Sequence, residues 1–419
     1  MLKNKNIYFI FPYKGTGGVS ILFLRMATYL ANIGYKNIYL VDYIDGYMAK
    51  NYDKTLLKFQ EYSQEKELEI TGNSIVIFQT MTPWSIYPFL KITKEVKVLF
   101  WNCHPMNLLP RAPFFGLNIY HNEFLGKVYL SLLFTHKKTL RVFLETLLKK
   151  KSILFMDYIN VDITKRFLGD FNDVQYLPIP SVGLKGKKYF STENNLNQDS
   201  LRITYVGRVE DFKVPPLKKV IKDISTARRK FSKKIIFNII GSGDSLDYIK
   251  EFSRNFKNIQ FKFIDYLTPE ELENFYINNT DLTIAMGTAA LDSARCSKPT
   301  ILLDFSFSDL DDKYKYKWIY ETKGFSLADY ISKGYIGEGT NTISSIFNQL
   351  ESNYEQICKH SFEYFDKNHN IKKIINDFII YLDDASCSWG DLDDLGILYK
   401  GIIYKIYRNK GIFRKKGKQ

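Results

Sequence analysis

Five apolar runs in the second half of the chain, separated by segments with helical patterns, constrain the fold more than any other feature of the sequence. They are short and rich in β-branched and aromatic residues, as is typical of strands, and they occupy Leu201–Val206, Ile235–Ile240, Asn258–Ile264, Asp281–Ala285 and Pro299–Asp304. A helix is expected after the third run, because Thr268 and Glu271 have the spacing of a capping box and Pro269 suits the first helical position. Strands that alternate with helices predict right-handed crossovers and a parallel sheet, with the turns after the strands at one edge.

Cations and glycines stand in the turns at that predicted edge. Gly207 ends the first strand, and Arg208 and Lys213 follow it. A glycine there lets the backbone approach a ligand closely, and an arginine fork together with a lysine can neutralise a diphosphate. The second strand likewise runs into Gly241 and Gly243. A lone arginine after a strand is also typical of a solvated loop, so the prediction of a phosphate site rests on the whole series of turns.

Six motifs follow one another in this half of the chain. They are Val206-Gly-Arg208, Ile240-Gly-Ser-Gly243, Phe263-x-Asp-Tyr-Leu267, Thr268-Pro-Glu-Glu271, Gly287-Thr-x-x-Leu-Asp292 and Lys298-Pro299. Their order resembles the donor domain of nucleotide-sugar glycosyltransferases with the GT-B fold, in the retaining branch that builds bacterial surface polysaccharides (the glycosyl transferases group 1, or family 4-like, branch). The resemblance extends from about Asn6 to Leu382. It implies an α/β chain with two Rossmann-like domains that face each other across a cleft.

The resemblance also implies roles for individual residues. Arg208 and Lys213 would stabilise the charge of a departing nucleoside diphosphate, and His104 would contact the transferred sugar. Tyr266 and Leu267 would meet the base. The full set that would bind the nucleotide sugar is Gly17, Gly18, Gly207, Gly241, Gly243, Tyr266, Leu267, Gly287, Thr288 and Asp292. The resemblance implies no metal ion and no cofactor besides the donor substrate.

One part of the family pattern is missing. The resembled family has two glutamates eight positions apart, the second of which binds the ribose hydroxyls. Asp292 keeps a carboxylate at the second place, but the position eight earlier is Ile284, inside a predicted strand. The backbone amides of Gly287 and Thr288 are expected to bind the diphosphate instead. The stereochemical course of the transfer and the sugar contacts therefore stay open.

The chain length indicates two domains. A sequence of 419 residues is too long for one ordinary core. The expected divisions are an acceptor-side domain at 1–185, a linker at 186–200, a nucleotide-sugar domain at 201–368, a helix at 369–385 that crosses back to the first domain, and a basic amphipathic tail at 386–419. In the first domain the expected strands are Asn6–Phe11, Ile38–Val41, Ser74–Phe78, Val96–Trp101, Ser152–Met156 and Gln175–Pro180.

Two loops of the first domain carry candidate site residues. Gly17 and Gly18 lie between the first strand and a helix, where free amides can receive a phosphate or a sugar. A plain tight turn and a dinucleotide fingerprint are the alternatives, although Ser20 replaces the third glycine of that fingerprint. His104 follows a strand end, where sites of open α/β sheets collect. A loop histidine bonded to backbone is its alternative reading.

The net charge of +14 indicates an anionic partner. Apolar and basic residues alternate in Phe124–Lys151 and in the tail Gly396–Gln419, a combination that suits an anionic membrane surface. For the first segment an ordinary helix packed on the domain is an equal alternative. No recognition motif accompanies the charge, so nucleic acid is not expected. The four cysteines are scattered, and no signal peptide or spanning run is apparent. The protein is expected in the cytoplasm, peripheral on the inner face of the plasma membrane.

Together these observations predict a metal-independent hexosyltransferase of the retaining type. It would transfer a sugar from a nucleoside-diphosphate sugar to a saccharide or lipid-linked acceptor in surface polysaccharide synthesis, of the O-antigen (lipopolysaccharide) or capsule type. A catalytically inactive partner subunit at the membrane is the alternative, because the first glutamate is missing, and a dinucleotide-dependent oxidoreductase is a weaker one. The base, the sugar, the acceptor and the oligomeric state are not legible from the residues.

Overall fold

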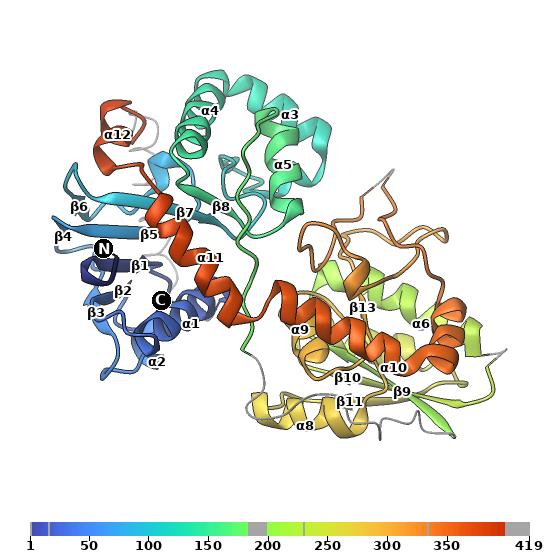
Figure 1. Ribbon diagram of the computed structural model, residues 1–419. Coiled ribbons are helices and arrows are strands. Elements are labelled where there is room, and N and C mark those ends of the chain that lie inside the picture. The colour runs from blue at the N-terminus through green and yellow to red at the C-terminus, as the bar shows by residue number, and fades with distance from the viewer. Residues whose placement is uncertain (1, 16, 183–198, 229–230, 333–334, 399–419) are drawn as a thin grey trace. The chain divides into compact units, whose positions relative to one another are not determined.

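The computed structural model describes residues 2–15, 17–182, 199–228, 231–332 and 335–398. The chain divides into two compact units (Figure 1). The first unit consists of Met1–Pro178 together with Ile375–Gln419, and the second is Ile179–Ile374. The first unit is therefore assembled from both ends of the sequence. Among the described residues, no helix has the length and apolar character needed to cross a bilayer.

The first unit is built on a parallel sheet with the strand order β3-β2-β1-β5-β7-β8. Its strands are β1 (Asn6–Ile10), β2 (Ile38–Asp42), β3 (Lys58–Glu61), β5 (Ser74–Gln79), β7 (Lys97–Asn102) and β8 (Ile153–Phe155). A second, two-stranded sheet pairs β4 (Leu68–Ile70) with β6 (Leu90–Ile92). The helices are α1 (Gly18–Asn32), α2 (Tyr47–Asn51), α3 (Glu123–Leu132), α4 (Phe134–Lys149), α5 (Tyr158–Leu168), α11 (Ile371–Asp384) and α12 (Trp389–Asp394).

The C-terminal segment completes the core of the first unit. Apolar residues of α11 recur at helical spacing, and the ring of Phe378 lies 6.1 Å from that of Phe9 and 5.9 Å from that of Trp101. After α11 the backbone runs beside the start of β7, where Val98 N–H donates to the carbonyl of Cys387 at 2.9 Å. Leu392 of α12 is fully buried. Residues 386–398, which the sequence assigned to a basic tail, are thus a packed part of this unit; residues 399–419 lie outside the described residues.

One expected strand of the first unit is wrong. In the segment Gln175–Pro180 only Tyr176 pairs with the sheet, in an isolated bridge to Phe155. The reason is the pair of prolines in Gln175-Tyr-Leu-Pro-Ile-Pro180, because proline has no N–H to donate to a strand ladder. The short strands β3, β4 and β6 were not expected.

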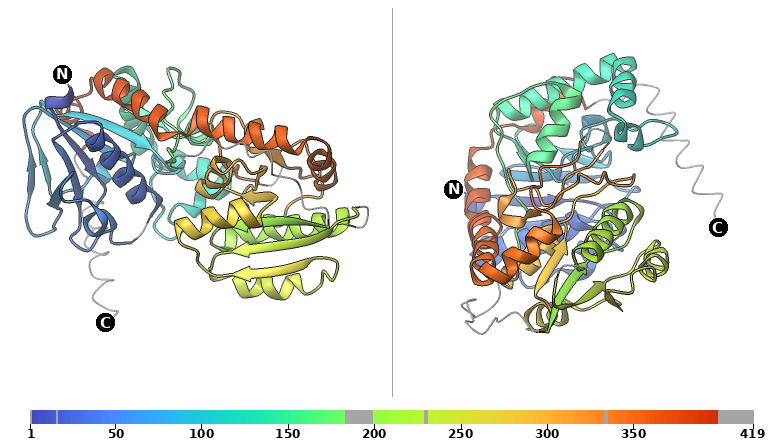
Figure 2. Two further views of the ribbon diagram at one scale, coloured as in Figure 1. Left: turned by 60° about the horizontal axis from the view of Figure 1, so that its bottom comes forward. Right: turned by 90° about the vertical axis from the view of Figure 1, so that its right-hand side faces the viewer.

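The second unit has the strand order β11-β10-β9-β12-β13-β14, parallel except for β14. The strands are β9 (Ser200–Val206), β10 (Lys234–Ile240), β11 (Gln260–Ile264), β12 (Leu282–Ala285), β13 (Thr300–Leu302) and β14 (Lys317–Trp318). The helices are α6 (Val214–Arg228), α7 (Leu246–Ser253), α8 (Pro269–Asn279), α9 (Thr288–Arg295) and α10 (Ile343–Asn368), the last kinked at Asn353. Helices lie on both faces of the sheet (Figure 2). All five expected strands are confirmed.

In the second unit the strand register places the ends of β9, β10 and β12 side by side. Val206 of β9 pairs with Ile240 of β10 on one side and with Ala285 of β12 on the other. Because these strands are parallel, the turns that follow them meet at one edge of the sheet. The capping box at the start of α8 is also confirmed, since Glu271 N–H donates to Thr268 Oγ1 at 3.3 Å and Thr268 N–H donates to Glu271 Oε2 at 2.8 Å.

Candidate nucleotide-sugar site

The turns after β9 and β10 pack directly against each other. Val209 N–H donates to the carbonyl of Ser242 at 2.9 Å, and Ser245 N–H donates to the carbonyl of Val209 at 3.1 Å. A Cβ on Gly241 would lie 2.5 Å from the carbonyl oxygen of Gly207, and one on Gly243 would lie 2.4 Å from that of Val209. These two glycines therefore have a structural reason to be glycine, which is the close contact of the two turns. Their packing fixes the backbone on which the cations stand.

Lys213 reaches back over the end of β9. It closes the short 3-10 helix η4 (Asp211–Lys213), and a Cβ on Gly207 would lie 3.2 Å from its Nζ atom. Burial of the side chain lowers the pKa of Lys213, nearby Arg208 lowers it further, and Glu210 opposes this effect. The ammonium group is thus held beside Gly207, at the carboxyl end of a central parallel strand.

Arg208 stands beside Lys213 but is far more exposed. Its guanidinium Nη1 lies 3.6 Å from Glu210 Oε1, with 78% of the side chain exposed. An exposed pair of this kind contributes little to stability. Arg208 can therefore leave Glu210 for a phosphate at small cost, whereas Lys213 is already in place. The two cations that the sequence singled out are brought together at one sheet edge.

The start of α9 offers backbone amides at the same edge, although fewer than expected. Gly287 has φ +62° and precedes the first helical residue, Thr288. The N–H of Gly287 donates to the carbonyl of Leu327 at 3.1 Å, so its contact with a diphosphate, which stays a prediction, would require this hydrogen bond to be exchanged. In the first turn of α9, Ala290 N–H donates to the carbonyl of Gly287 at 3.2 Å, whereas the amides of Thr288 and Ala289 precede the first carbonyl partner that a helix can offer. These two amides are the N–H donors that this turn can present to an anion.

Asp292 is held in place by neighbouring side chains. Its Oδ1 atom lies 3.2 Å from Arg295 Nε and accepts a hydrogen bond from Ser181 Oγ at 3.5 Å. About a third of the side chain is exposed, which leaves part of the carboxylate accessible to a ligand.

Tyr266 and Leu267 follow β11. Gly241 N–H donates to the carbonyl of Ile264, the last residue of that strand, at 3.0 Å. Tyr266 is strongly exposed.

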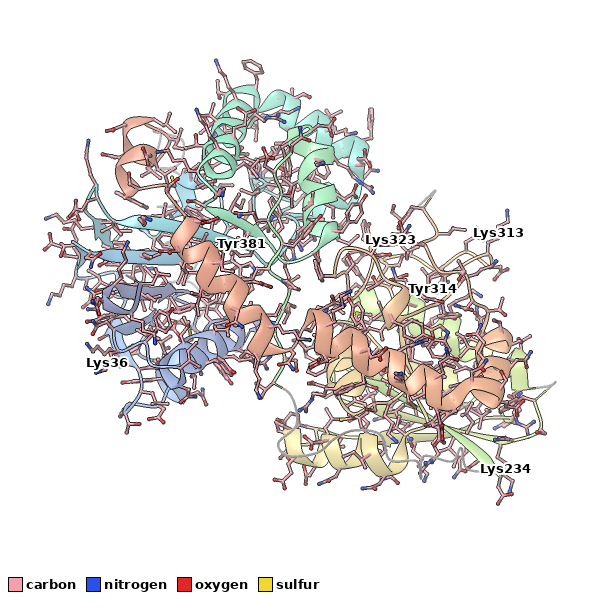
Figure 3. All side chains as sticks on the ribbon, in the orientation of Figure 1. Lys36, Lys234, Lys313, Tyr314, Lys323 and Tyr381 are labelled. Carbon is pink, nitrogen blue, oxygen red and sulfur yellow. The ribbon has the colours of Figure 1, made fainter. Side chains whose placement is uncertain are left out.

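A buried charged network next to the cations was not foreseen from the sequence. Asp304, just after β13, accepts hydrogen bonds from Asp329 N–H at 2.7 Å and from the hydroxyl of Tyr314 at 3.1 Å, and Asp329 pairs with Lys317 (Tyr314 is labelled in Figure 3). Burial raises the pKa of Asp304 to about 7. We call Asp304, Tyr314, Lys317 and Asp329 the Asp304 network.

The Asp304 network supports the backbone that carries Lys213. Ser306 N–H donates to the carbonyl of Phe212 at 3.0 Å, and the ring of Phe305 lies 6.0 Å from that of Phe212. Phe305 N–H in turn donates to the carbonyl of Asp329 at 3.0 Å. The network thus links the loop after β13 to η4. Sequence alone gave no signal for it beyond a polar loop, because the pairing of these charges depends on the fold.

In the first unit, His104 lies where the sequence placed it, after β7. Its Nδ1 atom accepts a hydrogen bond from Met106 N–H at 3.2 Å. The neutral ring therefore carries its proton on Nε2, as inferred from this bond. Desolvation of the ring lowers the pKa of His104, with smaller effects of Arg111 and His121 in the same direction. His104 is thus kept neutral and can donate a hydrogen bond from Nε2.

The glycine loop before α1 lacks the features of a dinucleotide site. Gly17 is the N-cap of α1, and its carbonyl accepts a hydrogen bond from the buried Ser20 Oγ at 2.9 Å; a Cβ on Gly18 would meet nothing. An acid at the end of β2 would bind the ribose in a dinucleotide fold. Here Asp42 accepts hydrogen bonds from Tyr13 N–H at 2.8 Å and from two further backbone amides. Because its carboxylate is engaged by these backbone amides, it is not held ready for a ribose, which argues against a dinucleotide-dependent oxidoreductase.

The part of the chain that the structure describes contains no cluster of histidine, cysteine and acidic side chains that could hold a metal ion.

Two Rossmann-like units, one after the other, define the GT-B class of fold, and the chain has that fold. HepE of Anabaena, solved in complex with UDP, is similar with a TM-score of 0.50 at 8% identity, over 90% of this chain and 99% of HepE. The N-terminal domain of trehalose-6-phosphate phosphatase of Candida albicans is similar with a TM-score of 0.51 at 10% identity, over 91% of this chain and 97% of that domain. No protein-family model and no curated protein sequence matches this chain.

Proposed function

We propose that this protein is a glycosyltransferase that binds a nucleoside-diphosphate sugar at the carboxyl edge of the sheet in its second unit. The observation that carries the proposal is the position of Lys213 over Gly207, with Arg208 beside it and the first turn of α9 at the same edge. These groups provide positive charge and N–H donors where a diphosphate would lie. HepE, which shares the fold, was solved with UDP bound.

The proposed chemistry needs little more than charge stabilisation. When the bond between the sugar and the diphosphate breaks, negative charge builds on the β-phosphate. Lys213 and the amides of the first turn of α9 would stabilise that charge from their present positions, and Arg208 would do so after leaving Glu210. Asp292 would hold the ribose hydroxyls, and Tyr266 would stack on or border the base. The Nε2–H of His104 would donate to a hydroxyl of the transferred sugar.

Binding and turnover test the proposal. Thermal shifts are measured with UDP, GDP, ADP and CMP, starting with UDP, and then with the sugars of whichever nucleotide stabilises the protein. We expect one nucleotide to raise the melting temperature and its sugar to be consumed in the presence of saccharide or lipid-linked acceptors. Absence of a shift with every nucleotide would overturn the assignment of this edge as the donor site.

An inactive partner subunit is the second candidate, and a specific observation favours it. Ile284, at the place of the first family glutamate, is fully buried inside β12. This position therefore supplies no carboxylate of the kind that the resembled family has near the sugar. Nucleotide binding without consumption of any nucleotide sugar would favour this candidate. Consumption, followed by analysis of the anomeric configuration of the product, would establish transfer and answer whether it is retaining.

The acceptor and the location belong to the same proposal. We place the reaction at the cytoplasmic face of the plasma membrane, on a saccharide or lipid-linked acceptor of bacterial surface polysaccharide synthesis. The support is the net charge of +14 and the resemblance of the motif order. The basic segment at 399–419, one of the two expected membrane segments, lies outside the described residues.

A further inference from the structure

Large apolar side chains are exposed together in one stretch of the first unit. They lie in the loop before the 3-10 helix η3 (Asn118–His121), along α3 and at the start of α4. The exposed residues are Phe114, Phe115, Phe124, Leu125, Val128, Leu132 and Phe134, and Phe114 is 94% exposed, Leu132 79% and Phe124 72%. Apolar side chains scattered singly on a surface need no explanation, but a contiguous set of this kind marks an interaction site.

The exposed residues of α3 form one face of that helix. Phe124, Val128 and Leu132 are spaced four residues apart, so they lie above one another. The opposite face is the packed one, where Leu130 and Gly126 are buried. A Cβ on Gly126 would lie 2.7 Å from the ring of Tyr120 and 2.8 Å from that of Phe167. The helix therefore buries its own inner face and leaves a second apolar face uncovered.

A tight loop places two more aromatic rings beside α3. Ala112 and Gly116 exchange both backbone hydrogen bonds, at 2.8 and 2.9 Å, so that residues 113–115 form the tip. Gly116 has φ +58°, which glycine adopts without strain. The hydroxyl of Tyr129 in α3 donates to the carbonyl of Arg111 at 3.1 Å and ties the loop to the helix. Loop and helix thus form one preformed surface.

Cations stand next to these apolar residues along the chain. Between residues 111 and 138 the sequence has Arg111, Lys127, Lys137 and Lys138 but only one acid, Glu123. Glu123 is itself neutralised, since its carboxylate lies 2.6 Å from Lys127 and 3.5 Å from Arg166. Exposed aromatic and aliphatic side chains together with neighbouring lysines and arginines, here called the rim cations, are the composition that binds the boundary between headgroups and acyl chains.

Resting on the membrane location proposed above, we propose that loop 112–116, the outer face of α3 and Phe134 form a docking surface for an anionic lipid bilayer, here called the α3 surface (Figure 1 labels α3). The structure separates it from the rest of the basic segment Phe124–Lys151. The apolar residues of α4, among them Phe143 and Leu147, are buried in the core, so that helix uses its apolar side within the protein. Apart from Phe134 at its start, α4 therefore contributes no apolar side chain to the proposed docking surface.

Lipid is favoured over the other candidate occupants by charge. The segment 399–419 of this chain carries eight lysines and arginines and no acid, so it has the same sign as the rim cations and would be repelled. A second copy of the chain would bring its own rim cations to the same place. An anionic headgroup layer complements the cations while its acyl region receives the aromatic rings.

The test uses the full chain and vesicles of phosphatidylcholine, alone or mixed with phosphatidylglycerol. The variant Phe114→Ser/Phe124→Ser/Leu132→Ser is compared with a matched control, Ile44→Ser/Ile380→Ser, which removes two exposed isoleucines of the same unit, 63% and 56% exposed. We expect the triple variant to lose at least about tenfold in partitioning to the mixed vesicles, because the burial of several large apolar side chains is lost. The control should bind like the original chain.

Two further measurements separate a loss of membrane binding from a loss of folding and test insertion directly. UDP binding and the melting temperature of each variant report on the fold and on the proposed donor site separately from vesicle binding. A Phe114→Trp variant should gain blue-shifted emission on adding mixed vesicles, and an Ile44→Trp variant should not. The proposal is overturned if the triple variant partitions normally, if Phe114→Trp shows no shift, or if the triple variant changes only the oligomeric state.

Discussion

At the scale of single residues, the two cations after β9 differ in how they are prepared for a ligand. Lys213 is partly desolvated and positioned over Gly207, whereas Arg208 lies in an exposed pair with Glu210. Lys213→Met and Arg208→Ala should each lower turnover by roughly 10²–10³, equivalent to about 2–4 kcal/mol of transition-state stabilisation. Lys234→Ala is the control, because Lys234 begins β10 and thus stands at the opposite edge of the same sheet (labelled in Figure 3). Equal turnover in all three variants would exclude the donor-site assignment.

His369 gives a second prediction at this scale. Its ring is fully buried between the carbonyl of Ile179, at 2.8 Å from Nδ1, and the hydroxyl of Tyr364, at 3.2 Å from Nε2. Burial lowers the pKa of His369 to about 4, below the usual value of an unfolded histidine, about 6.5. The unfolded chain therefore binds a proton first as the pH falls, and the free energy of unfolding should decrease between about pH 6.5 and 4, by roughly 2–3 kcal/mol. Urea unfolding across this range should show a shallower pH dependence for His369→Gln than for the original chain.

At the scale of elements, the Asp304 network couples the loop after β13 to η4. Burial raises the pKa of Asp304 to about 7, well above the usual value of about 3.9 for an unfolded aspartate. The folded state then binds more protons than the unfolded state between about pH 4 and 7, so this group makes stability fall as the pH rises through that range. The sign is opposite to that of His369.

Asp304→Asn tests this assignment, because asparagine imitates the protonated carboxyl group. In this variant the free energy of unfolding should no longer include the decrease that Asp304 causes as the pH rises from about 4 to 7. Urea unfolding of the variant and of the original chain at several pH values measures the difference. Asp309→Asn is the control, since Asp309 is an exposed partner of Lys218 outside the network. If the two variants show the same pH dependence, Asp304 does not titrate in this range.

The elements that the sequence predicted are those with local signals. The strands of the second unit alternate with helices, and the capping box of Thr268 and Glu271 at the start of α8 is formed within four residues. The short strand β3, with the polar sequence Lys-Phe-Gln-Glu, gave no such signal, because its pairing comes from the neighbouring β2.

The residues of the candidate site likewise fall into those that local sequence signals predicted and those that they did not. Arg208 and Lys213 were predictable because a strand, a glycine and two cations follow one another along the chain. The Asp304 network was not, since Lys317 and Asp329 reach Asp304 only through the folding of a long loop. The hydrogen bond from Gly287 N–H to the carbonyl of Leu327 could not be predicted for a related reason, because Leu327 is distant in sequence.

At the scale of the whole molecule, the packed segment 386–398 decides where the chain can be shortened. Leu392 is buried, and Asp391 lies 2.9 Å from Lys150. A chain that ends at Leu398 should keep its melting temperature and the nucleotide binding proposed above, whereas one that ends at Ala385 should unfold at a clearly lower temperature, as the core loses Cys387 and Leu392. Differential scanning calorimetry separates the two truncations, and equal stability would contradict the packing of this segment.

The same truncation at Leu398 separates two contributions to vesicle binding. The removed residues carry eight cations, each of which can gain up to about 1 kcal/mol near an anionic surface at low salt. The shortened chain should lose the larger share of the affinity that high salt also removes, because most of the cations are in the removed segment. It should keep the salt-resistant part, which we assign to the apolar side chains of the α3 surface, and the smaller salt-dependent part from the cations near that surface. Co-sedimentation at low and high salt measures both, and complete loss of binding would assign it all to the removed segment.

The division of the first unit between the two ends of the sequence has a consequence for biosynthesis. A ribosome synthesises Ile179–Ile374, the whole of the second unit, before it makes the residues that close the first. Until then β7 lacks the backbone partner at Cys387, and Phe9 and Trp101 lack the ring of Phe378. The domain begun first is thus the domain finished last. A nascent chain interrupted before Ile375 would carry one folded domain behind an unfinished one, whose uncovered apolar surface is the kind that chaperones bind.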